Sequence, residues 1–308
     1  MTTRRSKSGA RQSGFTLVEL LVAITVIAIL VGMLSAAVIP ALTRAKETAI
    51  ISQMKLLEHG LEAFKNDHGF YPPSFVKINF DSSGTERPVA DKKALLLRYL
   101  NKIAPNHREG VGAVGNRPID GWWDAVGQYI DADHGDDLVF WLSGLSKNAQ
   151  YPLTNNGTSA PVAYNDRTIE RQEYFEFPTG QLDAHGVTAH FQQQRGVEAS
   201  WTYIDSASYN NGTSFDGYHV LNSVATPTKV YENPNTYQLV CPGMDKEIGM
   251  PSVQWAEQTG PGYEGLINII DRGNLKPGTR HSDNICNFCE GRLERLTNGV
   301  LDSSAVQY

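Results

Sequence analysis

The sequence predicts an α+β protein: a long N-terminal helix whose second half packs on a small antiparallel β-sheet, with a large irregular insertion. Three observations indicate this class. No residue from Leu20 through Thr43 is charged, and the run is rich in Ile, Leu, Val and Ala. An apolar stripe at helical spacing continues from Ile50 to Phe64. Short runs of β-branched and aromatic residues follow between turn signals, and Tyr237–Val240 is the clearest strand among them.

The uncharged run is long enough to cross a membrane. At ~1.5 Å per residue, a helix of this length spans the ~30 Å hydrocarbon core of a bilayer. We expect one helix over residues 15–68, with a transmembrane part at about 20–42, that Pro40 kinks or locally melts. The preceding leader, residues 1–14, carries four basic residues and no acid. The positive-inside rule therefore keeps the N-terminus cytoplasmic and exports the rest of the chain.

The second half of this helix is amphipathic, and its apolar residues recur every three or four positions. They are Ile50, Met54, Leu57, Leu61 and Phe64. Such a stripe predicts that this half lies on a folded domain. The helix should end at Asn66–Gly69, because Gly69 can take the left-handed conformation that closes a helix. The following Tyr71-Pro72-Pro73 forces an extended chain.

The rest of the chain, residues 69–308, is expected to form one exported globular head, in which residues 80–231 are the insertion. Two further helices are predicted, over Asp91–Ile103 and over Asp136–Leu145 with Asp136 as the N-cap. Short strands, besides the one already named, are predicted over residues 201–204, 217–221 and 229–231. No linker is long enough to separate a second domain within the head.

Charge and motifs exclude several functions. Removal of the leader takes four of the 27 basic residues and none of the 33 acidic ones, so the net charge falls from −6 to −10. A surface this acidic argues against a nucleic-acid partner. Gly110–Gly115 fits G-x-G-x-x-G but lacks the strand and helix that a dinucleotide site needs. The eight histidines are dispersed without a ligand-spaced pair, and no catalytic signature is present, so we expect no enzyme.

A single acid, Glu19, lies at the edge of the apolar run. A carboxylate at a membrane usually has a partner, and we expect none from within this segment. A cut between Gly14 and Phe15 would place a new ammonium four residues before Glu19, on the same helix face. The amine and the carboxylate could then pair, within one chain or between neighbouring chains, in a medium of low dielectric constant.

The sequence from Gly14 through Phe15-Thr16-Leu17-Val18-Glu19 into the apolar run resembles the processing site of type IV pilins and type II secretion pseudopilins. The resemblance implies cleavage after Gly14 by a prepilin peptidase and methylation of the Phe15 amine. It also implies assembly by an inner-membrane platform into a filament of this chain and other pilin-like subunits, with Phe15 and Glu19 setting docking and register. The alternative is a plain signal-anchor helix with an incidental acid.

Three further stretches resemble parts of the major pseudopilin of type II secretion. Gly69-Phe70-Tyr71-Pro72 is similar to its Gly-x-Tyr-Pro turn. Tyr237–Asp245 and Ser282–Phe288 resemble two stretches that together bind calcium in that subfamily. The resemblance implies Ca²⁺ as a candidate cofactor, and the candidate ligands are Asp245, Glu247, Asp283 and Asn284. Lys246 and Asn284 depart from the family pattern, and a solvated acidic loop without metal is the alternative.

Three cysteines, Cys241, Cys286 and Cys289, lie near these stretches. An exported compartment permits disulfides, and a bridge from Cys241 to Cys286 or Cys289 would hold the two stretches together. Free thiols, or a zinc site completed by His281, are the alternatives. The odd number leaves at least one thiol free or bonded to another chain.

The favoured function is a structural subunit of a pilus-like filament, most like a type II secretion pseudopilin, held in the bacterial inner membrane by a single span before it joins a periplasmic or surface filament. A type IV pilin whose head is an adhesion or uptake module is the alternative, and exposed basic or aromatic patches would favour it. A more remote alternative is an envelope enzyme with a borrowed processing signal, which buried acids or histidines in the insertion would favour. The five tryptophans could line a sugar-binding face, or they could be core.

Overall fold

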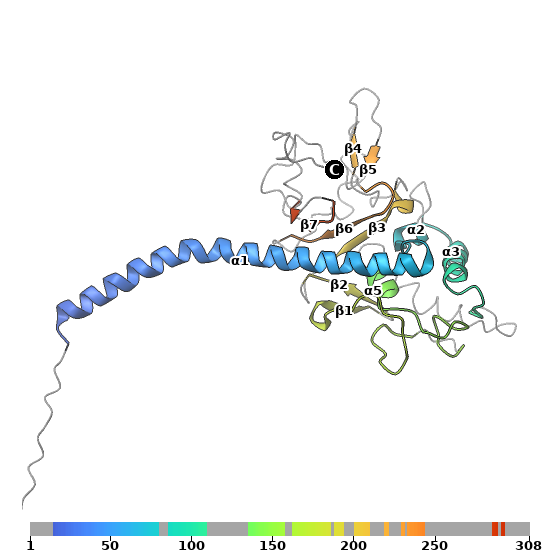
Figure 1. Cartoon of the computed structure of the whole chain (residues 1–308), viewed down its shortest axis with the longest axis horizontal. Coiled ribbons are helices and arrows are strands. Elements are labelled where there is room, and N and C mark those ends of the chain that lie inside the picture. Colours follow the sequence, from blue (N-terminus) through green and yellow to red (C-terminus); the bar gives the residue numbers. More distant parts are fainter. Residues whose placement is uncertain are drawn as a thin grey trace, which may run out of the picture. The chain divides into compact units, whose positions relative to one another are not determined.

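A computed structural model of the chain describes residues 15–79, 86–109, 135–157, 162–185, 188–193, 200–209, 219–221, 229–231, 233–243, 285–288 and 291–292. Helix α1 (Leu17–His68) opens the described chain (Figure 1). The chain divides into two compact units, Met1–Lys46 and Glu47–Tyr308, and α1 passes from the first into the second. The fold class is α+β, as predicted.

The described part of the first unit is the first half of α1, and the apolar side chains described there, before and after residues 34–37, are exposed. Leu17 and Val18, for example, are 79% and 69% exposed. Within the described residues, α1 is the one helix long and apolar enough to cross a membrane. The helix runs unbroken through Pro40, so the local melting considered for this proline does not occur. The expected membrane-compatible helix is confirmed in length and composition.

In the second unit, α1 supplies the centre of the core. The predicted stripe is confirmed, because all five of its side chains are between 0% and 6% exposed: Ile50, Met54, Leu57, Leu61 and Phe64. Fully burying a leucine side chain contributes about 1.5–3 kcal/mol. The helix ends at His68, where Gly69 has a φ of +80° and donates its backbone N–H to the carbonyl oxygen of Lys65 at 2.6 Å, as predicted.

Within the described residues, three short helices follow α1. They are α2 (Phe75–Asn79), α3 (Val89–Ile103) and α5 (Asp136–Leu142). The helix predicted over Asp91–Ile103 is confirmed in α3. The N-cap predicted for α5 is wrong, because Gly135 is the N-cap residue, with a φ of +67°. A Cβ atom at Gly135 would lie 2.3 Å from the carbonyl oxygen of Trp201. Glycine is therefore required there both by its positive φ and by this close approach.

The strands in the described part of the chain form three antiparallel sheets. Two described 3₁₀ turns flank them: η1 (Thr179–Gln181) precedes β1, and η2 (Ser206–Ser208) follows β3. The first sheet is the hairpin of β1 (Leu182–His185) and β2 (Thr188–Phe191), and the second pairs β4 (His219–Leu221) with β5 (Lys229–Tyr231). The third has the order β3-β6-β7-β8, with β3 (Thr202–Asp205), β6 (Tyr237–Cys241), β7 (Ile285–Cys286) and β8 (Gly291–Arg292). The predicted strands are confirmed within a residue or two of their bounds, and β1, β2, β7 and β8 were not predicted.

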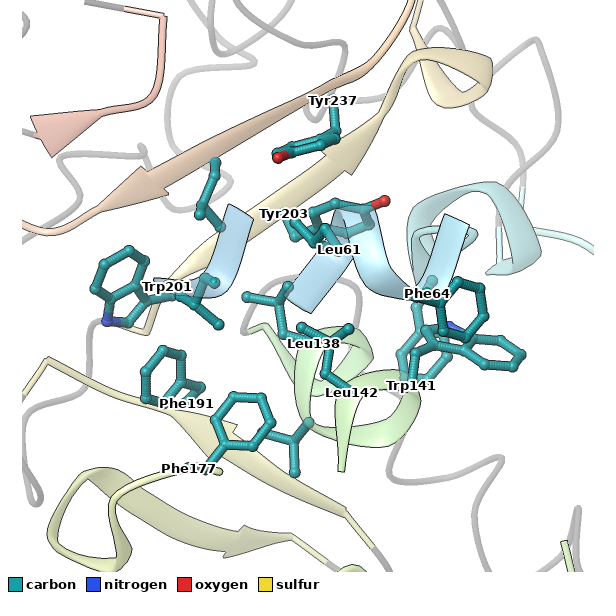
Figure 2. Close-up of a cluster of buried hydrophobic side chains, with 14 of the residues drawn as sticks. Leu61, Phe64, Leu138, Trp141, Leu142, Phe177, Phe191, Trp201, Tyr203 and Tyr237 are labelled. Atoms are coloured by element: carbon teal, nitrogen blue, oxygen red, sulfur yellow. The ribbon is translucent and has the colours of Figure 1, made fainter. Parts of the chain in front are cut away.

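The core of the second unit has three layers. The second half of α1 lies between strands β3 and β6 on one side and α5 with the β1–β2 hairpin on the other (Figures 1 and 2). Tyr203 and Tyr237 approach the helix from the sheet, while Leu138 and Trp141 approach it from α5 (Figure 2). Both described tryptophans, Trp141 and Trp201, are fully buried. They are therefore core residues, and they line no sugar-binding face.

The turn after α1 is anchored to both outer layers. The Tyr203 hydroxyl donates a hydrogen bond to the carbonyl oxygen of Pro72 at 2.7 Å, and the Trp141 indole N–H donates to that of Pro73 at 3.0 Å. Proline has no N–H to donate, so these carbonyls are its backbone hydrogen-bonding groups. The backbone N–H of Ser74 donates to Oδ1 of Asp205 at 3.0 Å. The predicted Gly-x-Tyr-Pro turn thus fixes the direction in which the chain leaves α1.

Candidate functional site

The first turn of α1 forms a reciprocal set of hydrogen bonds between Thr16 and Glu19. The backbone N–H of Thr16 donates to Oε2 of Glu19 at 2.9 Å, and the Thr16 hydroxyl donates to the same oxygen at 2.8 Å. In return, the backbone N–H of Glu19 donates to Oγ1 of Thr16 at 3.2 Å. This is a capping box, in which a threonine and a glutamate three residues apart satisfy backbone groups at a helix start.

The capping box corrects the expectation that the segment offers Glu19 no partner. Sequence reasoning overlooked that Thr16 and Glu19 have the T-x-x-E spacing of a capping box directly before an apolar run. The carboxylate is therefore held within its own helix before any second group approaches. All these bonds to the carboxylate end on Oε2, so within the part of the chain that the structure describes Oε1 is left to accept a further donor.

Phe15, the residue before the capping box, is 85% exposed. It lies next to a helix surface that is apolar on all sides, which includes Leu20, Leu21 and Ile24 at 53–59% exposure. Gly14 lies outside the described residues, so the cleavage at the Gly14–Phe15 bond stays a prediction. The geometry presents an accessible Phe15, one acid and a long apolar surface, which is the chemistry of a membrane anchor and of helix–helix assembly.

The second predicted site lies where β6 meets β7. The structure pairs Val240 with Cys286 and Cys241 with Ile285, so the two stretches that were expected to act together do lie side by side. Asn287 adds two hydrogen bonds between these stretches. Its Oδ1 accepts the backbone N–H of Leu239 at 2.9 Å, and its backbone N–H donates to the Leu239 carbonyl oxygen at 3.1 Å. The candidate calcium ligands Asp245, Glu247, Asp283 and Asn284 lie outside the described residues, and the calcium site stays a prediction.

Helix α1 also contributes to this junction through Glu58. Its carboxylate is half-buried and hydrogen-bonds to the side chain of Asn287. Burial raises the pKa of Glu58, and the hydrogen bond to Asn287 opposes that rise. The end of β7 is therefore connected to both β6 and the long helix through one asparagine side chain.

Comparison with known proteins identifies the family. The first part of the chain, residues 9–35, matches the model of the prokaryotic N-terminal methylation motif. The type II secretion system core protein G of Pectobacterium carotovorum subsp. carotovorum is 31% identical over 140 residues, which are 78% of that protein and 44% of this chain. The chain belongs to the type II secretion system core protein G family. The protein of the same name from Vibrio cholerae serotype O1 is 29% identical over 140 residues, 83% of its own length and 44% of this chain. No solved structure matches.

The predicted disulfide from Cys241 of this pseudopilin to Cys286 or Cys289 is wrong. Cys241 is a free, buried thiol, whereas Cys286 is disulfide-bonded. The strand register gives the reason. Cys241 is opposite Ile285 and Cys286 is opposite Val240, and directly paired residues share a face while successive residues alternate. Cys241 and Cys286 therefore face opposite sides of the sheet and cannot be joined without moving backbone. The third cysteine, Cys289, lies outside the described residues.

Two consequences follow for the thiol chemistry. Burial raises the pKa of Cys241 well above its ordinary value, so the thiol stays protonated and unreactive in the core. The zinc site considered for Cys241, Cys286, Cys289 and His281 is also wrong, because a disulfide-bonded sulfur is no thiolate ligand.

Sequence reasoning also missed a histidine pair. His185 and His190 were expected to be dispersed like the others, but the β1–β2 hairpin brings them together, with ring centroids 4.3 Å apart and the rings stacked. Both face Asp136 at the start of α5. The only signal in the sequence is two histidines five residues apart around Gly186, and it becomes informative once a hairpin is recognised there.

Proposed function

We propose that this pseudopilin is cleaved between Gly14 and Phe15, methylated on the new amine, and polymerised through α1 into the filament of a type II secretion system. The observation that carries the proposal is the start of α1, where an accessible Phe15 and a capped Glu19 precede an exposed apolar helix. Membership in the core protein G family supports this. The relatives are named for a secretion system and not for a reaction, and the proposed role is structural.

The exposed half of α1 is expected to serve in two environments. Its apolar side chains gain about 25 cal/mol for each Å² removed from water, whether lipid or a neighbouring helix covers them. In the monomer, lipid covers them and anchors the subunit in the membrane. In the filament, the same residues of adjacent subunits replace the lipid. The basic leader favours an inner-membrane protein with a cytoplasmic N-terminus, from which the head projects into the exported compartment.

Glu19 is proposed to set the register between subunits. The capping box occupies Oε2 and leaves Oε1 for the ammonium of Phe15 from a neighbouring subunit. Between packed apolar helices the dielectric constant is low, so such a pair is stronger than in water and a mispaired acid is costly. N-methylation keeps the positive charge of the amine and is compatible with this pairing.

The proposal implies a defined set of partners. A prepilin peptidase would cut the leader, an inner-membrane platform would extract the subunit, and copies of this chain with other pilin-like subunits would form the filament. More than half of this chain lies outside the residues matched to its relatives. We propose that this additional sequence belongs to the head and leaves the assembly chemistry of α1 unchanged.

Two measurements on assembled material test the proposal. Sheared filaments should be imaged by electron microscopy, and their repeating subunit identified by intact-mass spectrometry. The expected subunit begins at N-methylated Phe15. Filaments whose subunits retain residues 1–14, or membranes that contain the processed chain without any filament in a host with a complete assembly system, would contradict it.

A further inference from the structure

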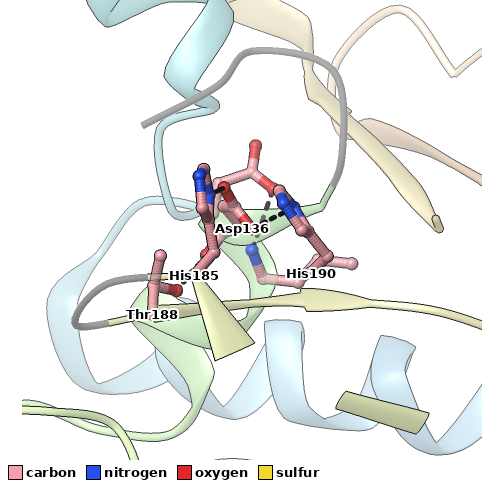
Figure 3. Close-up of polar contacts among 6 residues, drawn as sticks. Asp136, His185, Thr188 and His190 are labelled. Atoms are coloured by element: carbon pink, nitrogen blue, oxygen red, sulfur yellow. Dashed lines mark hydrogen bonds and ion pairs between the residues drawn. The ribbon is translucent and has the colours of Figure 1, made fainter. Parts of the chain in front are cut away.

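We propose that Asp136, His185 and His190 form a binding site for a divalent transition-metal ion of the zinc class, which clips the β1–β2 hairpin to helix α5. The three residues offer one oxygen and two nitrogen ligands, and their ligand atoms all lie within 4.8 Å of one another. Figure 3 shows the two imidazoles facing the same carboxylate from the hairpin. This cluster lies within the head and is separate from both the start of α1 and the β6–β7 junction.

The hairpin register explains why the two histidines meet. His185 pairs with Thr188 across the hairpin, and His190 lies two residues further along the same strand as Thr188. Directly paired residues share a face, and so do residues two apart in one strand. His185 and His190 are therefore diagonal neighbours on one face, at a separation that aromatic rings can bridge.

The third ligand comes from the element packed against the hairpin. Asp136 is the first residue of α5, and the Thr188 hydroxyl donates to its carbonyl oxygen at 3.1 Å, which ties β2 to the start of that helix. Nδ1 of His185 lies 3.2 Å from Oδ2 of Asp136, and Nδ1 of His190 lies 2.8 Å from Oδ1 (Figure 3). The donor atoms thus come from two elements whose relative position is already fixed by a separate hydrogen bond.

These separations suit a metal ion. A zinc ion bound ~2.0–2.1 Å from each of its ligands in a tetrahedral site needs ligand atoms roughly 3.3 Å apart. The two histidines contact different oxygens of the carboxylate, at 3.2 Å and 2.8 Å, and one ligand atom from each of the three residues lies within 4.8 Å of the others. Small side-chain rotations would bring one oxygen and both nitrogens to the spacing that the ion needs. The side chain of His185 is 27% exposed and that of His190 is 18% exposed, so an ion can enter from solvent. Three protein ligands leave a fourth position for water.

The charges and the donor types select the class of ion. The Asp136 side chain is fully buried, at 0% exposure, and a buried carboxylate is costly without a compensating cation. Imidazole nitrogens suit zinc, copper, nickel and iron, whereas calcium and magnesium take oxygen ligands. A site of two imidazoles and one carboxylate therefore differs in chemistry from the predicted calcium site of the C-terminal stretches.

The experiment uses the full-length protein in detergent, purified without a polyhistidine tag and stripped with a chelator. Zinc chloride is titrated into it by isothermal calorimetry, and thermal melting is recorded with and without zinc. The variants are His190→Gln and His185→Gln, each of which removes one ligand and keeps a polar side chain. His59→Gln is the matched control, because His59 is an exposed histidine of α1 outside the cluster.

Wild type and His59→Gln are expected to bind one zinc ion and to melt at a higher temperature with zinc. Each cluster variant should bind at least about tenfold more weakly, since even loss of an outer-shell partner of a metal site commonly costs 10–100-fold. Its melting temperature should no longer respond to zinc. Absence of zinc binding by wild type, or unchanged affinity in both cluster variants, would overturn the proposal and leave the histidines as ion-pair partners of Asp136.

A second measurement does not depend on the folding of any variant. Cobalt replaces zinc in the wild-type protein, and its visible absorption reports the ligands. Bands of a nitrogen and oxygen site without sulfur charge transfer are expected. Sulfur-to-cobalt charge transfer would instead assign the ion to cysteine and overturn the site at the hairpin.

Discussion

Replacement of Leu61 by alanine tests whether the second half of α1 is part of the core of the head. Leu61 is 0% exposed and lies between the four-stranded sheet and α5 (Figure 2). Leucine-to-alanine changes at fully buried sites cost about 2–5 kcal/mol, from lost transfer free energy and from the cavity left behind. For a folded unit of about 150–250 residues, each kcal/mol lowers Tm by roughly 2–4 °C. We therefore expect Leu61→Ala to lower Tm by about 4–20 °C.

The same change at Leu56 is the matched control. Leu56 lies on the same helix but is 60% exposed, so Leu56→Ala should stay within about ±0.5 kcal/mol of wild type. Unfolding of the full-length protein in detergent is followed by the fluorescence of its tryptophans, of which Trp141 and Trp201 are fully buried. Equal Tm values for the two variants would refute the packing argument, because it depends on the difference in their burial.

Three further outcomes are expected. Glu19→Gln keeps the spacing of the capping box but removes the charge, so it should remain in the membrane without forming filaments. Thr16→Val keeps the charge and should still assemble, and normal filament numbers for Glu19→Gln by electron microscopy would contradict docking through charge. The pKa of Glu58 is raised in the folded state, so its stabilising contribution is present below the unfolded pKa of 4.5 and is lost as pH rises through the folded pKa. Glu58→Gln should therefore have a higher Tm than wild type at neutral pH, and this difference should disappear near pH 4. An equal Tm difference at both pH values would reject this. Millimolar calcium, more than magnesium, should raise the Tm of wild type but not of Asp245→Ala or Asp283→Ala, and an unchanged wild-type melting curve would argue against the calcium site.

The sequence was most informative where one periodic pattern extends over many residues. The stripe from Ile50 to Phe64 repeats for several turns, and Gly69 terminates it, so both the buried face and the end of α1 could be predicted. Strands of two to four residues carry no comparable pattern. The strands near residues 202–205, 219–221 and 229–231 could still be predicted from their β-branched and aromatic residues. The hairpin of Leu182–His185 and Thr188–Phe191 has few such residues, and its pairing depends on contacts with α5 and the core.

The candidate sites also differ in whether they depend on neighbouring residues in the sequence or on the pairing of distant strands. The Thr16–Glu19 capping box is local, and its T-x-x-E spacing directly before an apolar run is visible in the sequence. The error about Cys241 has a different origin. Whether two cysteines on neighbouring strands can bond depends on a register of one residue, which the sequence does not specify when both faces of the strand are buried.

The capping box also indicates how assembly can depend on processing. Glu19 lies in the first turn of α1, where the positive end of the helix dipole and the Thr16 hydrogen bonds stabilise its carboxylate within a single chain. The unprocessed subunit can therefore keep its acid at the membrane without a partner chain. Cleavage after Gly14 would leave these bonds intact, because the donors are the amide and the hydroxyl of Thr16 and not the amide of Phe15. It would add only one group, the ammonium of Phe15, for which Oε1 of Glu19 on a neighbour is the acceptor. While the leader is attached, the Phe15 nitrogen is an amide and cannot pair with Glu19 of a neighbour as an ammonium. Filament growth would therefore begin only with processed subunits.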